Sequence, residues 1–599
     1  MLAKELELRE ADKFAADDGL QLPENPLPLA NLDKNIVCAD SLFTDWPKAD
    51  AIIGNPPYLG SRYLAKEHGY DYANKLYARF PDVPKMADFC THWFRLAHDA
   101  LPLCTAQNPC SGRAGLVGTN TIRQNESREA SLDYIVENGG VITEAISTQV
   151  WSGDAAVHVS IVNWEKTAVA ETVRATRAPG STGVPPVVSG GPPETSDVEN
   201  APISSSSGSD APATSGGFGG SPKPTGGPPV LPRICRLTFQ RGDSVDSPWE
   251  TYELPVINPA LSVGTDVTGA QVLAANAKPK VVFQGQKPNH EGFFLTPDEA
   301  ANWIRKDARY RDVLFPYMIG RDLVDVGAPS RWVIDFAKRD VFGARDYELA
   351  FDRVRTTVMP DIVAKAEKER ADTGRENGVW SRMAEQWWHY ERQRHECIAA
   401  INLLPRYMAI SRVTKRPIFD FLSSAIHPDT ALIVFAFADD YSFGILQSSL
   451  HWEWFKARCS TLKADFRYTS DTVFDTFPWP QTPTKGQIAE VAAASVALRA
   501  LRREIMARLG YSLRALYRTL DSPGANPLRE AHTRLDTAVR AAYAMPKAAD
   551  PLAFLLALNL TLAAKEKSGE PITSPGLPLP EAERAPFVTD DCVRVTKPE

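Results

Sequence analysis

Residues 169–232 limit the fold of this chain more than any other stretch. The segment begins VAETVRATRAPGSTGVPPVV and continues in runs of Ser, Gly and Pro, with very few large apolar side chains. Such a composition cannot bury enough apolar surface to offset the entropy that is lost on ordering. We therefore predict a disordered linker or loop at 169–232, with folded parts on both sides of it.

The length and composition of the chain indicate a soluble protein of two or three globular units, because 599 residues exceed one typical domain several times. No window approaches the roughly 18 apolar residues that cross a bilayer, and the charged amino terminus lacks a signal-peptide core. We predict a cytoplasmic location. The eight cysteines have no metal-ligand spacing, which favours reduced thiols and no metal site. The net charge of −8 leaves nucleic-acid binding open, since only one face needs to be positive.

Apolar runs and helical patterns alternate before residue 169. We predict strands over 35–40, 50–55, 114–122, 140–147 and 157–164 and a helix over 86–101, an order typical of a mainly parallel α/β sheet. After the linker, residues 235–480 mix short strands with loops rich in Trp, Tyr, Arg and Lys. Residues 486–518 and 528–545 are helical in composition, and the tail is Pro-rich and irregular.

The tetrapeptide Asn55-Pro56-Pro57-Tyr58 directly follows one of the predicted strands, where α/β proteins place their sites. An amino group conjugated to a ring is a poor nucleophile, because its lone pair is delocalised. The Asn55 side-chain oxygen and the Pro56 carbonyl would accept hydrogen bonds from such an amine and pull its nitrogen toward tetrahedral geometry. The prolines fix φ, and Tyr58 would stack on a base taken out of a duplex. The alternative is an ordinary Asn-Pro turn.

This tetrapeptide resembles motif IV of the amino-methyltransferases that use S-adenosylmethionine, above all the N6-adenine DNA methyltransferases. It also resembles the motif of enzymes that methylate a protein glutamine, so it does not choose the substrate alone. Longer stretches favour DNA: the segment LANLDKNIVCADSLFTDWPKADAIIGNPPYLGSRY is similar to the methyltransferase core of the MmeI-like DNA adenine methyltransferases. The segments at 281–295, 314–323 and 462–480 resemble the target-recognition domain of that group.

The resemblance implies a partial Rossmann-like class I methyltransferase sheet, then a mixed α+β target-recognition domain and a helical carboxyl-terminal region. The expected boundaries are 1–168 for the core, 169–232 for the linker, 233–480 for recognition and 481–599 for the helical region and tail. The implied activity is transfer of a methyl group from S-adenosylmethionine to adenine N6 in double-stranded DNA, as part of a restriction-modification or phage-defence system.

Asp40 ends the predicted strand before the tetrapeptide, where a carboxylate of this fold typically accepts from the adenine of the cofactor. A helix cap or a surface carboxylate is the alternative. Cys38 of the same strand is predicted to be a core residue. Asp154 and His158 resemble an acid/base pair, but the alternating pattern around His158 favours a structural role. The run EQWWHYER (385–392) more often packs against a neighbouring element than stacks on bases.

Residues 278–467 are rich in Lys and Arg, and several of these side chains are expected to contact phosphates, among them Lys287, Arg412 and Arg467. In the related enzymes, two residues before an RYS-like step read one base pair. The matching residues here are Lys463 and Asp465, which can donate to guanine and accept from cytosine, so they would read one G·C pair. A surface ion pair is the alternative.

The Gly-rich cofactor turn and the acidic residue after the second strand of this family have no counterpart in the sequence. The glycines of SGGFGGS (215–221) lie in the linker and follow no strand. We therefore expect that an amino-terminal truncation has occurred, that an upstream-encoded segment carries the turn, and that the chain alone does not bind S-adenosylmethionine. DNA cleavage is not expected. A catalytically silent DNA-recognition fragment or subunit remains the alternative to an enzyme.

Overall fold

The computed structural model describes residues 36–151, 157–168, 234–240, 244–374, 376–462 and 465–595. The predicted linker at 169–232, Asp154 and Lys463 lie outside these residues. The described residues form two compact units. The first comprises those of Met1–Gly118, Glu126–Val141 and Val162–Ser181, and the second comprises those of Thr119–Asn125, Ile142–Ile161 and Thr182–Glu599.

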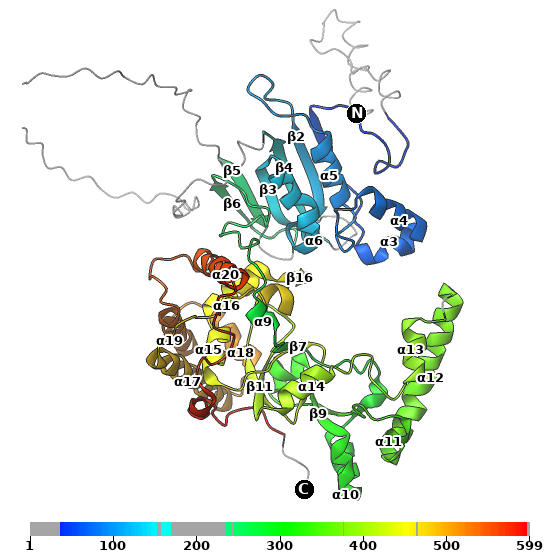
Figure 1. Cartoon of the computed structure of the whole chain (residues 1–599), viewed down its shortest axis with the longest axis vertical. Helices are drawn as coiled ribbons and strands as arrows, with labels where there is room; N and C mark the ends of the chain where they lie inside the picture. The colour runs from blue at the N-terminus through cyan, green and yellow to red at the C-terminus, as the bar shows by residue number, and fades with distance from the viewer. Residues whose placement is uncertain are drawn as a thin grey trace, which may run out of the picture. The chain divides into compact units, whose positions relative to one another are not determined.

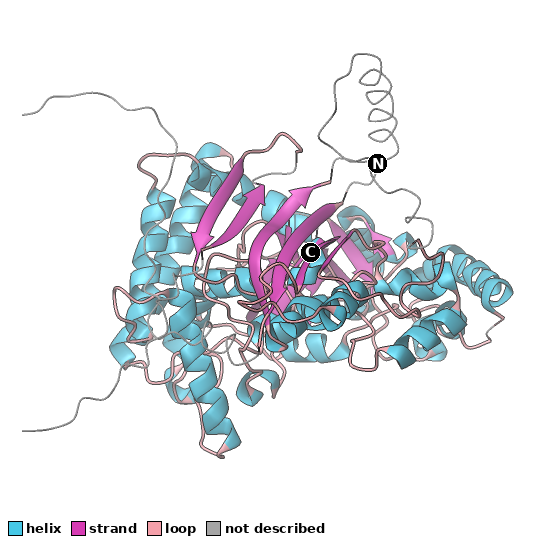
Figure 2. Cartoon of the chain, turned by 90° about the horizontal axis from the view of Figure 1, so that it is seen from above, coloured by secondary structure: helices cyan, strands magenta, loops and turns pink. Residues whose placement is uncertain are grey.

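The first large sheet has six strands in the order β1-β2-β4-β3-β5-β6 (Figures 1 and 2). The strands are β1 (Ala51–Gly54), β2 (Arg113–Thr119), β3 (Gly140–Val150), β4 (His158–Lys166), β5 (Cys235–Gln240) and β6 (Trp249–Leu254). β1 runs parallel to β2, and β3 runs parallel to β5, whereas β5 and β6 are antiparallel. The first four strands confirm four of the five predicted ones. Nothing in the sequence indicates that β5 and β6, beyond the predicted linker, join this sheet.

The predicted strand at 35–40 is wrong, because residues 36–40 form no strand. Among the described residues, β1 is the end strand of the sheet and its outer edge is open, but residues 36–40 do not pair with it. Asp40 instead opens a tight turn, in which the Phe43 amide donates to the Asp40 carbonyl over 3.1 Å. Cys38 is consequently exposed, which corrects its predicted place in the core.

Five helices belong to this part of the chain, three of them between β1 and β2. Their bounds are α3 (Ser61–His68), α4 (Tyr70–Arg79), α5 (Thr91–Ala100), α6 (Asn125–Arg128) and α7 (Tyr134–Glu137). α5 confirms the predicted helix at 86–101. Its buried face includes Phe94, whose ring stacks on the buried Trp164 of β4 with centroids 5.8 Å apart.

The second unit contains three further sheets, with the strand orders β14-β9-β10-β8, β13-β11-β15-β7 and β12-β17-β16. Their strands are β7 (Val282–Gln284), β8 (Phe294–Leu295), β9 (Leu314–Met318), β10 (Arg331–Ile334), β11 (Arg406–Ser411), β12 (Val413–Thr414), β13 (Asp420–Ser423), β14 (His427–Pro428), β15 (Leu432–Phe435), β16 (Ser460–Leu462) and β17 (Asp465–Arg467).

Helices surround these sheets. They are α9 (Ala274–Ala277), α10 (Pro297–Lys306), α11 (Val341–Arg345), α12 (Glu348–Thr373), α13 (Val379–Glu385), α14 (His395–Asn402), α15 (Asp440–Gln447), α16 (Ser449–Arg458), α17 (Lys485–Leu509), α18 (Leu513–Arg518), α19 (Pro527–Ala542) and α20 (Pro551–Lys567). α17 begins with a capping box of Thr484 and Gln487 and ends at Gly510, whose φ of 65° suits glycine. The helical prediction for 486–518 and 528–545 is confirmed by α17, α18 and α19.

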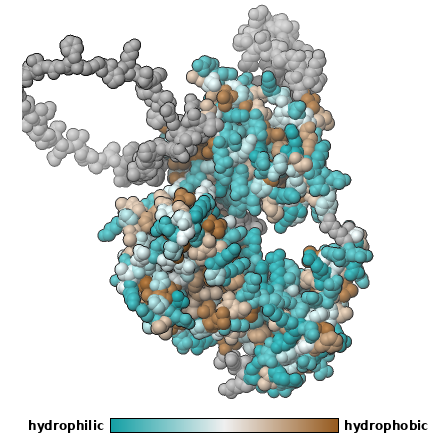
Figure 3. All heavy atoms as spheres, in the orientation of Figure 1, coloured by the Kyte–Doolittle hydropathy of each residue, from teal (hydrophilic) through white to brown (hydrophobic). Residues whose placement is uncertain are grey.

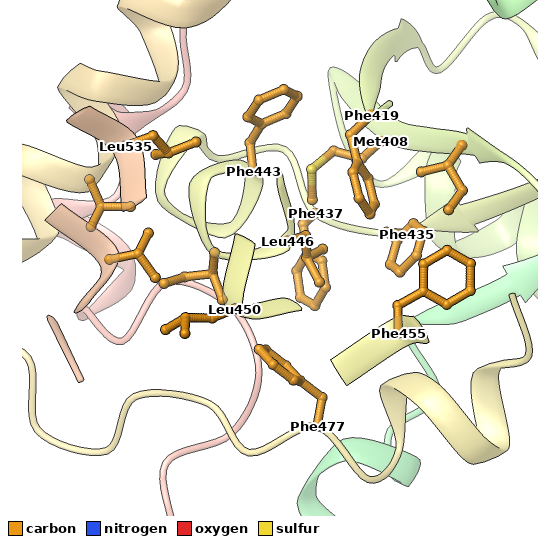
Figure 4. Packing of buried hydrophobic residues seen from close by; sticks show 14 of the residues in the cluster. Met408, Phe419, Phe435, Phe437, Phe443, Leu446, Leu450, Phe455, Phe477 and Leu535 are labelled. Atoms are coloured by element: carbon orange, nitrogen blue, oxygen red, sulfur yellow. The ribbon is translucent and has the colours of Figure 1, made fainter. Parts of the chain in front are cut away.

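One hydrophobic core joins the sheet of β11, β13 and β15 to the carboxyl-terminal helices. Phe419, Phe435 and Met408 from the sheet side pack near Phe443 and Leu446 of α15, and Leu535 of α19 closes the other side (Figure 4). The sheet of β11, β13 and β15 and the helices from α15 onward therefore share one hydrophobic core.

Hydrophilic residues dominate the face drawn in Figure 3, with apolar residues scattered among them. No helix among the described residues is long and apolar enough to cross a membrane. The chain thus has a mixed α/β architecture: an amino-terminal sheet, a mixed region of small sheets and a helical carboxyl-terminal region.

Candidate active site

The tetrapeptide lies in the turn between β1 and α3, at the carboxyl end of a strand that is parallel to its neighbour. Asn55 and Pro57 are exposed, Pro56 is buried, and Tyr58 is half-buried. The Tyr58 hydroxyl donates a short hydrogen bond to the Asn55 side-chain oxygen. The structure therefore brings together the two side chains of the tetrapeptide that carry polar groups.

A pocket of about 540 Å³ opens beside this turn. Asn55, Pro56 and Pro57 form one wall of it, and Asp40 with Ser41 forms another. Aromatic rings provide much of the remaining lining, from Trp46, His68, Tyr72, Phe89 and Trp93. The pocket thus combines hydrogen-bond acceptors with flat apolar faces, which suits a ring that carries an amino group.

Asp40 is exposed and is held by its own turn. The Leu42 amide donates to Asp40 Oδ1 over 3.0 Å, and the Thr44 hydroxyl donates to the Asp40 carbonyl over 2.8 Å. Burial, followed by a hydrogen bond and the charge of Asp40, raises the pKa of Tyr72 to about 12. The Asp40 side chain therefore stabilises a turn and also lines the pocket.

Two tryptophans fix the segment next to Asp40. The Trp93 indole donates to the Ser41 hydroxyl over 2.9 Å, and the Trp46 indole donates to the Ser41 carbonyl over 2.8 Å. Sequence reasoning missed Ser41, Tyr72 and both tryptophans as site residues. The only available signal is that Trp93 lies within the predicted helix at 86–101, and this does not indicate which way the ring points.

The electrostatic environment of Tyr58 keeps its hydroxyl protonated. Burial first, and then the neighbouring Cys90, raises the pKa of Tyr58, against a smaller lowering by the hydrogen bond to Asn55. No group of three or more His, Cys, Asp or Glu side chains in the described parts of the chain is arranged to hold a metal ion. Hydrogen bonding and stacking are thus the chemistry that these pocket residues offer.

The predicted DNA-contacting residues occupy different surroundings. Lys287 Nζ lies 2.6 Å from Glu391 Oε2. Lys463 lies outside the described residues. For Asp465, the first residue of β17, only the backbone is described. Arg412 and Arg467 are close in the fold, because the Tyr468 amide donates to the Arg412 carbonyl over 2.9 Å.

Two other sequence predictions concern residues away from the pocket. His158 is the first residue of β4 and is half-buried. Trp387 packs against Phe351 of α12 with ring centroids 5.2 Å apart, and the Trp388 indole donates to the Arg339 carbonyl. The packing role predicted for the run EQWWHYER is confirmed.

The family comparisons match both halves of the chain. Residues 8–174 match the family described as the MmeI DNA-methyltransferase domain, and residues 270–481 match the MmeI target recognition domain. The first match contains the tetrapeptide and the pocket. The second contains Arg412, Arg467 and the hairpin of β16 and β17.

Individual relatives are more distant. DNA methyltransferase A of Bacillus subtilis (strain 168) is 22% identical over 538 residues, which cover 87% of this chain and 49% of the relative. The solved structure of the type IIL restriction-modification enzyme MmeI in complex with DNA has a TM-score of 0.63 at 19% identity, and the match covers 92% of this chain and 63% of that one.

The chain therefore spans about half to two thirds of the length of these proteins, and the similarity to the solved structure is one of fold. The two family matches supply the more specific result, because each covers one of the two functional regions in the expected order. Together they identify the chain as an MmeI-like protein, with a DNA-methyltransferase domain followed by a target recognition domain.

Proposed function

We propose that this chain transfers a methyl group from S-adenosylmethionine to the N6 amino group of adenine in double-stranded DNA. The observation that carries the proposal is the exposed Asn55 acceptor at the wall of an aromatic pocket that Asp40 also lines. When bound, S-adenosylmethionine supplies the electrophilic methyl group. The exocyclic amine of adenine is the nucleophile that two such acceptors would activate.

The pocket residues fit part of the cofactor. Asp40 offers a carboxylate that can accept from an adenine amino group, and the rings of Trp46 and Trp93 offer flat surfaces for an aromatic base. The described residues provide no glycine-rich turn for the methionine part. We therefore assign Asp40 to the adenosine part of the cofactor and leave the other part to residues outside those described.

Asn55 would accept one amine hydrogen through its side-chain oxygen, and the Pro56 carbonyl would accept the other. Pro57 fixes the backbone that follows, which keeps the carbonyl of Pro56 in place. Tyr58 would stack on the extruded base, so its hydroxyl must give up the hydrogen bond to Asn55 when the substrate enters. The target adenine and Tyr58 thus compete for one oxygen atom.

Recognition of DNA would fall to the second unit, with Lys287, Arg412 and Arg467 near the phosphates and Lys463 with Asp465 at one G·C pair. The proposed biological setting is a restriction-modification or phage-defence system. The family match of residues 270–481 supports the proposal that the second unit recognises DNA, because that family is named for target recognition.

The end strand of the sheet favours a second segment as a partner. Among the residues that the structure describes, β1 has a neighbour on one side only, and Ile53 in it is 87% exposed. Ile36 and Val37 beside the pocket turn are also exposed, at 73% and 69%. We propose that a further strand carrying the cofactor turn, such as one encoded upstream, pairs with this edge. A catalytically silent recognition subunit is the alternative if no such strand exists.

The test is methyl transfer from labelled S-adenosylmethionine to DNA by the chain together with that segment. Asn55→Ala should lower the rate by about 10²-fold or more, since it removes an acceptor that acts in the transition state. DNA binding should be unchanged. Asn74→Ala, at an exposed position of α4, is the matched control and should retain full activity. Equal adenine methylation by the Asn55 variant and the control would refute the catalytic role.

A further inference from the structure

Four arginines from separate segments of the second unit converge in the target recognition region. Arg392 and Arg394 precede α14, Arg412 follows β11, and Arg467 ends β17. We call these four residues the arginine cluster. Arg392 and Arg394 were not among the cationic residues that the sequence pointed to.

Hydrogen bonds place the three segments that carry these arginines side by side. The Arg412 amide donates to the Ala431 carbonyl over 2.8 Å, and the Arg412 carbonyl accepts from the Tyr468 amide, next to Arg467. On the other side, Arg394 Nη2 donates to the Gln284 side-chain oxygen over 3.2 Å. The Gln284 amide group in turn donates to the carbonyl of Thr430, the residue before Ala431. Contacts of Gln284 in β7 and of Thr430 and Ala431, just before β15, therefore bring together Arg394 and Arg412.

Arg394 shows two unusual features. Its φ of 56° lies in the left-handed region, which non-glycine residues rarely adopt. Its Nε atom is buried and has no hydrogen-bond partner. Backbone strain and an unsatisfied buried donor both cost free energy, and both concentrate at functional sites. The fold thus maintains Arg394 in a position that its own stability does not favour.

The cluster carries more positive charge than its surroundings neutralise. Partial burial first, and then the charges of Arg467, Arg392 and Arg394, lowers the pKa of Arg412. Among the side chains that the structure describes, Glu391 is the acid paired with a cluster member, 3.7 Å from Arg392 Nε. Glu391 also lies 2.6 Å from Lys287 Nζ, so one carboxylate serves two cations. An anion from outside is the missing counter-charge.

We infer that the arginine cluster binds backbone phosphates of duplex DNA, with Arg392 and Arg394 as direct contacts. The inference rests on the proposed function, in which the second unit recognises DNA. Guanidinium groups match the geometry of phosphate oxygens and stay charged at any physiological pH. Arg392 is accessible, with 55% of its side chain exposed. Phosphate contacts explain a cluster of like charges better than base contacts, because each phosphate brings a full negative charge.

The experiment is a fluorescence anisotropy titration of the full chain with a random-sequence duplex over a series of salt concentrations. Each lost phosphate contact lowers the slope of log K against log salt by about 0.9. The double variant Arg392→Ala, Arg394→Ala should therefore have a slope about 2 smaller and bind roughly 10- to 100-fold more weakly at 0.1 M salt. The double variant Arg355→Ala, Arg508→Ala is the matched control. It removes the same charge at two exposed sites that pair with Asp352 and Glu504.

A third variant, Arg392→Lys with Arg394→Lys, keeps the charge and should keep the slope within about half a unit of the native one. It also guards against loss of binding through misfolding of the alanine variant. An alanine variant with the native slope would overturn the inference, and so would a lysine variant that loses as much slope as the alanine variant. If the native chain itself fails to bind duplex DNA, the proposed function fails, which is a different result.

Discussion

At the scale of single residues, the Asn55 side-chain oxygen is the atom on which the proposed chemistry depends. In this structure it accepts the Tyr58 hydroxyl, and Tyr58 belongs to the same four-residue turn. Asn55 is exposed, so the hydrogen bond from Tyr58 contributes only about 1 kcal/mol and can be exchanged at small cost. An incoming amine must replace that bond, and the exchange favours ligands that donate over those that only stack.

Specificity is also a matter of two residues. We expect that Lys463→Glu combined with Asp465→Arg changes the preferred base pair from G·C to C·G at one position, because donor and acceptor exchange places. A matched bidentate contact discriminates by about 1–3 kcal/mol, so the change should be clear when methylated sites are sequenced.

The control for this exchange is Lys456→Glu with Glu453→Arg, which reverses a surface ion pair of 2.8 Å on α16. This control should leave the recognised sequence unchanged. If the Lys463 and Asp465 variant methylates the same sites as the native chain, the two residues do not read a base pair.

Residue-level prediction from the sequence can group residues that are close together in the chain. Asn55 and Tyr58 are three positions apart, and one turn brings them into contact. It has less power where partners are distant: Lys287 meets Glu391 across more than a hundred residues. Arg392 and Arg394 are ordinary cationic residues in ERQRHE, and tertiary contacts through Gln284 of β7 bring their segment near Arg412.

At the scale of elements, local signals predict helices and paired strands well. The capping residues Thr484 and Gly510 mark the limits of α17, and alternating apolar residues mark β2 and β4. The strand predicted at 35–40 is wrong although an open strand edge exists, because residues 36–40 stay exposed and lead into the turn at Asp40. The membership of β5 and β6 in the first sheet is equally invisible, since strand pairing is set by the tertiary fold.

The free edge of β1 leads to a prediction at this scale. Calorimetric titration of the chain alone with S-adenosylmethionine should show little binding, and co-expression with a segment that carries a glycine-rich cofactor turn should restore stoichiometric binding. Ile53→Asp should abolish the restored binding, because a charge on an edge strand opposes pairing. The same variant should barely change the stability of the chain alone, since surface substitutions usually cost within about 0.5 kcal/mol.

Tyr70→Asp, at a position that is 64% exposed on α4, is the control for Ile53→Asp. It should leave the restored binding intact. Stoichiometric binding of the cofactor by the chain alone would show that the edge of β1 needs no added strand.

At the scale of the whole molecule, a buried ionic network joins the recognition sheets to the carboxyl-terminal helices. Arg406 of β11 and Arg499 of α17 are each about 2% exposed, and both contact Asp440 and Asp591. Asp591 belongs to a segment that runs along β13, where the Val593 amide donates to the Phe421 carbonyl over 2.8 Å. Ion pairs thus join β11, α17 and the segment around Asp591.

Asp591→Asn should destabilise this unit by about 3 kcal/mol or more, because it leaves the buried Arg406 and Arg499 to share the single carboxylate of Asp440. The measurement is urea unfolding followed by tryptophan fluorescence, since Trp454 and Trp479 lie in the same core. Asp590→Asn is the neighbouring control: Asp590 is 95% exposed, so its loss should cost less than about 0.5 kcal/mol. Equal unfolding midpoints for the two variants would exclude a stabilising role for the network.

Acid should destabilise the fold through protonation of Asp591. Burial raises the pKa of Asp591, but hydrogen bonds and ion pairs with Arg499, together with Thr589 and Arg503, lower it well below its usual range. A depressed carboxyl pKa stabilises the fold above the unfolded value of about 4, and this contribution is lost as the pH falls below it. The pH dependence of unfolding below about pH 4 should therefore be shallower in Asp591→Asn than in the native chain.

The Arg406–Asp591 contact also orders events during synthesis of the protein. The two residues are 185 positions apart in the chain, so Arg406 leaves the ribosome long before its partner has been translated. Until then, Asp440 is the carboxylate that pairs with Arg406, since it lies only 34 positions further along the chain. The complete network of Arg406, Arg499, Asp440 and Asp591 can therefore form only after residue 591 has been translated.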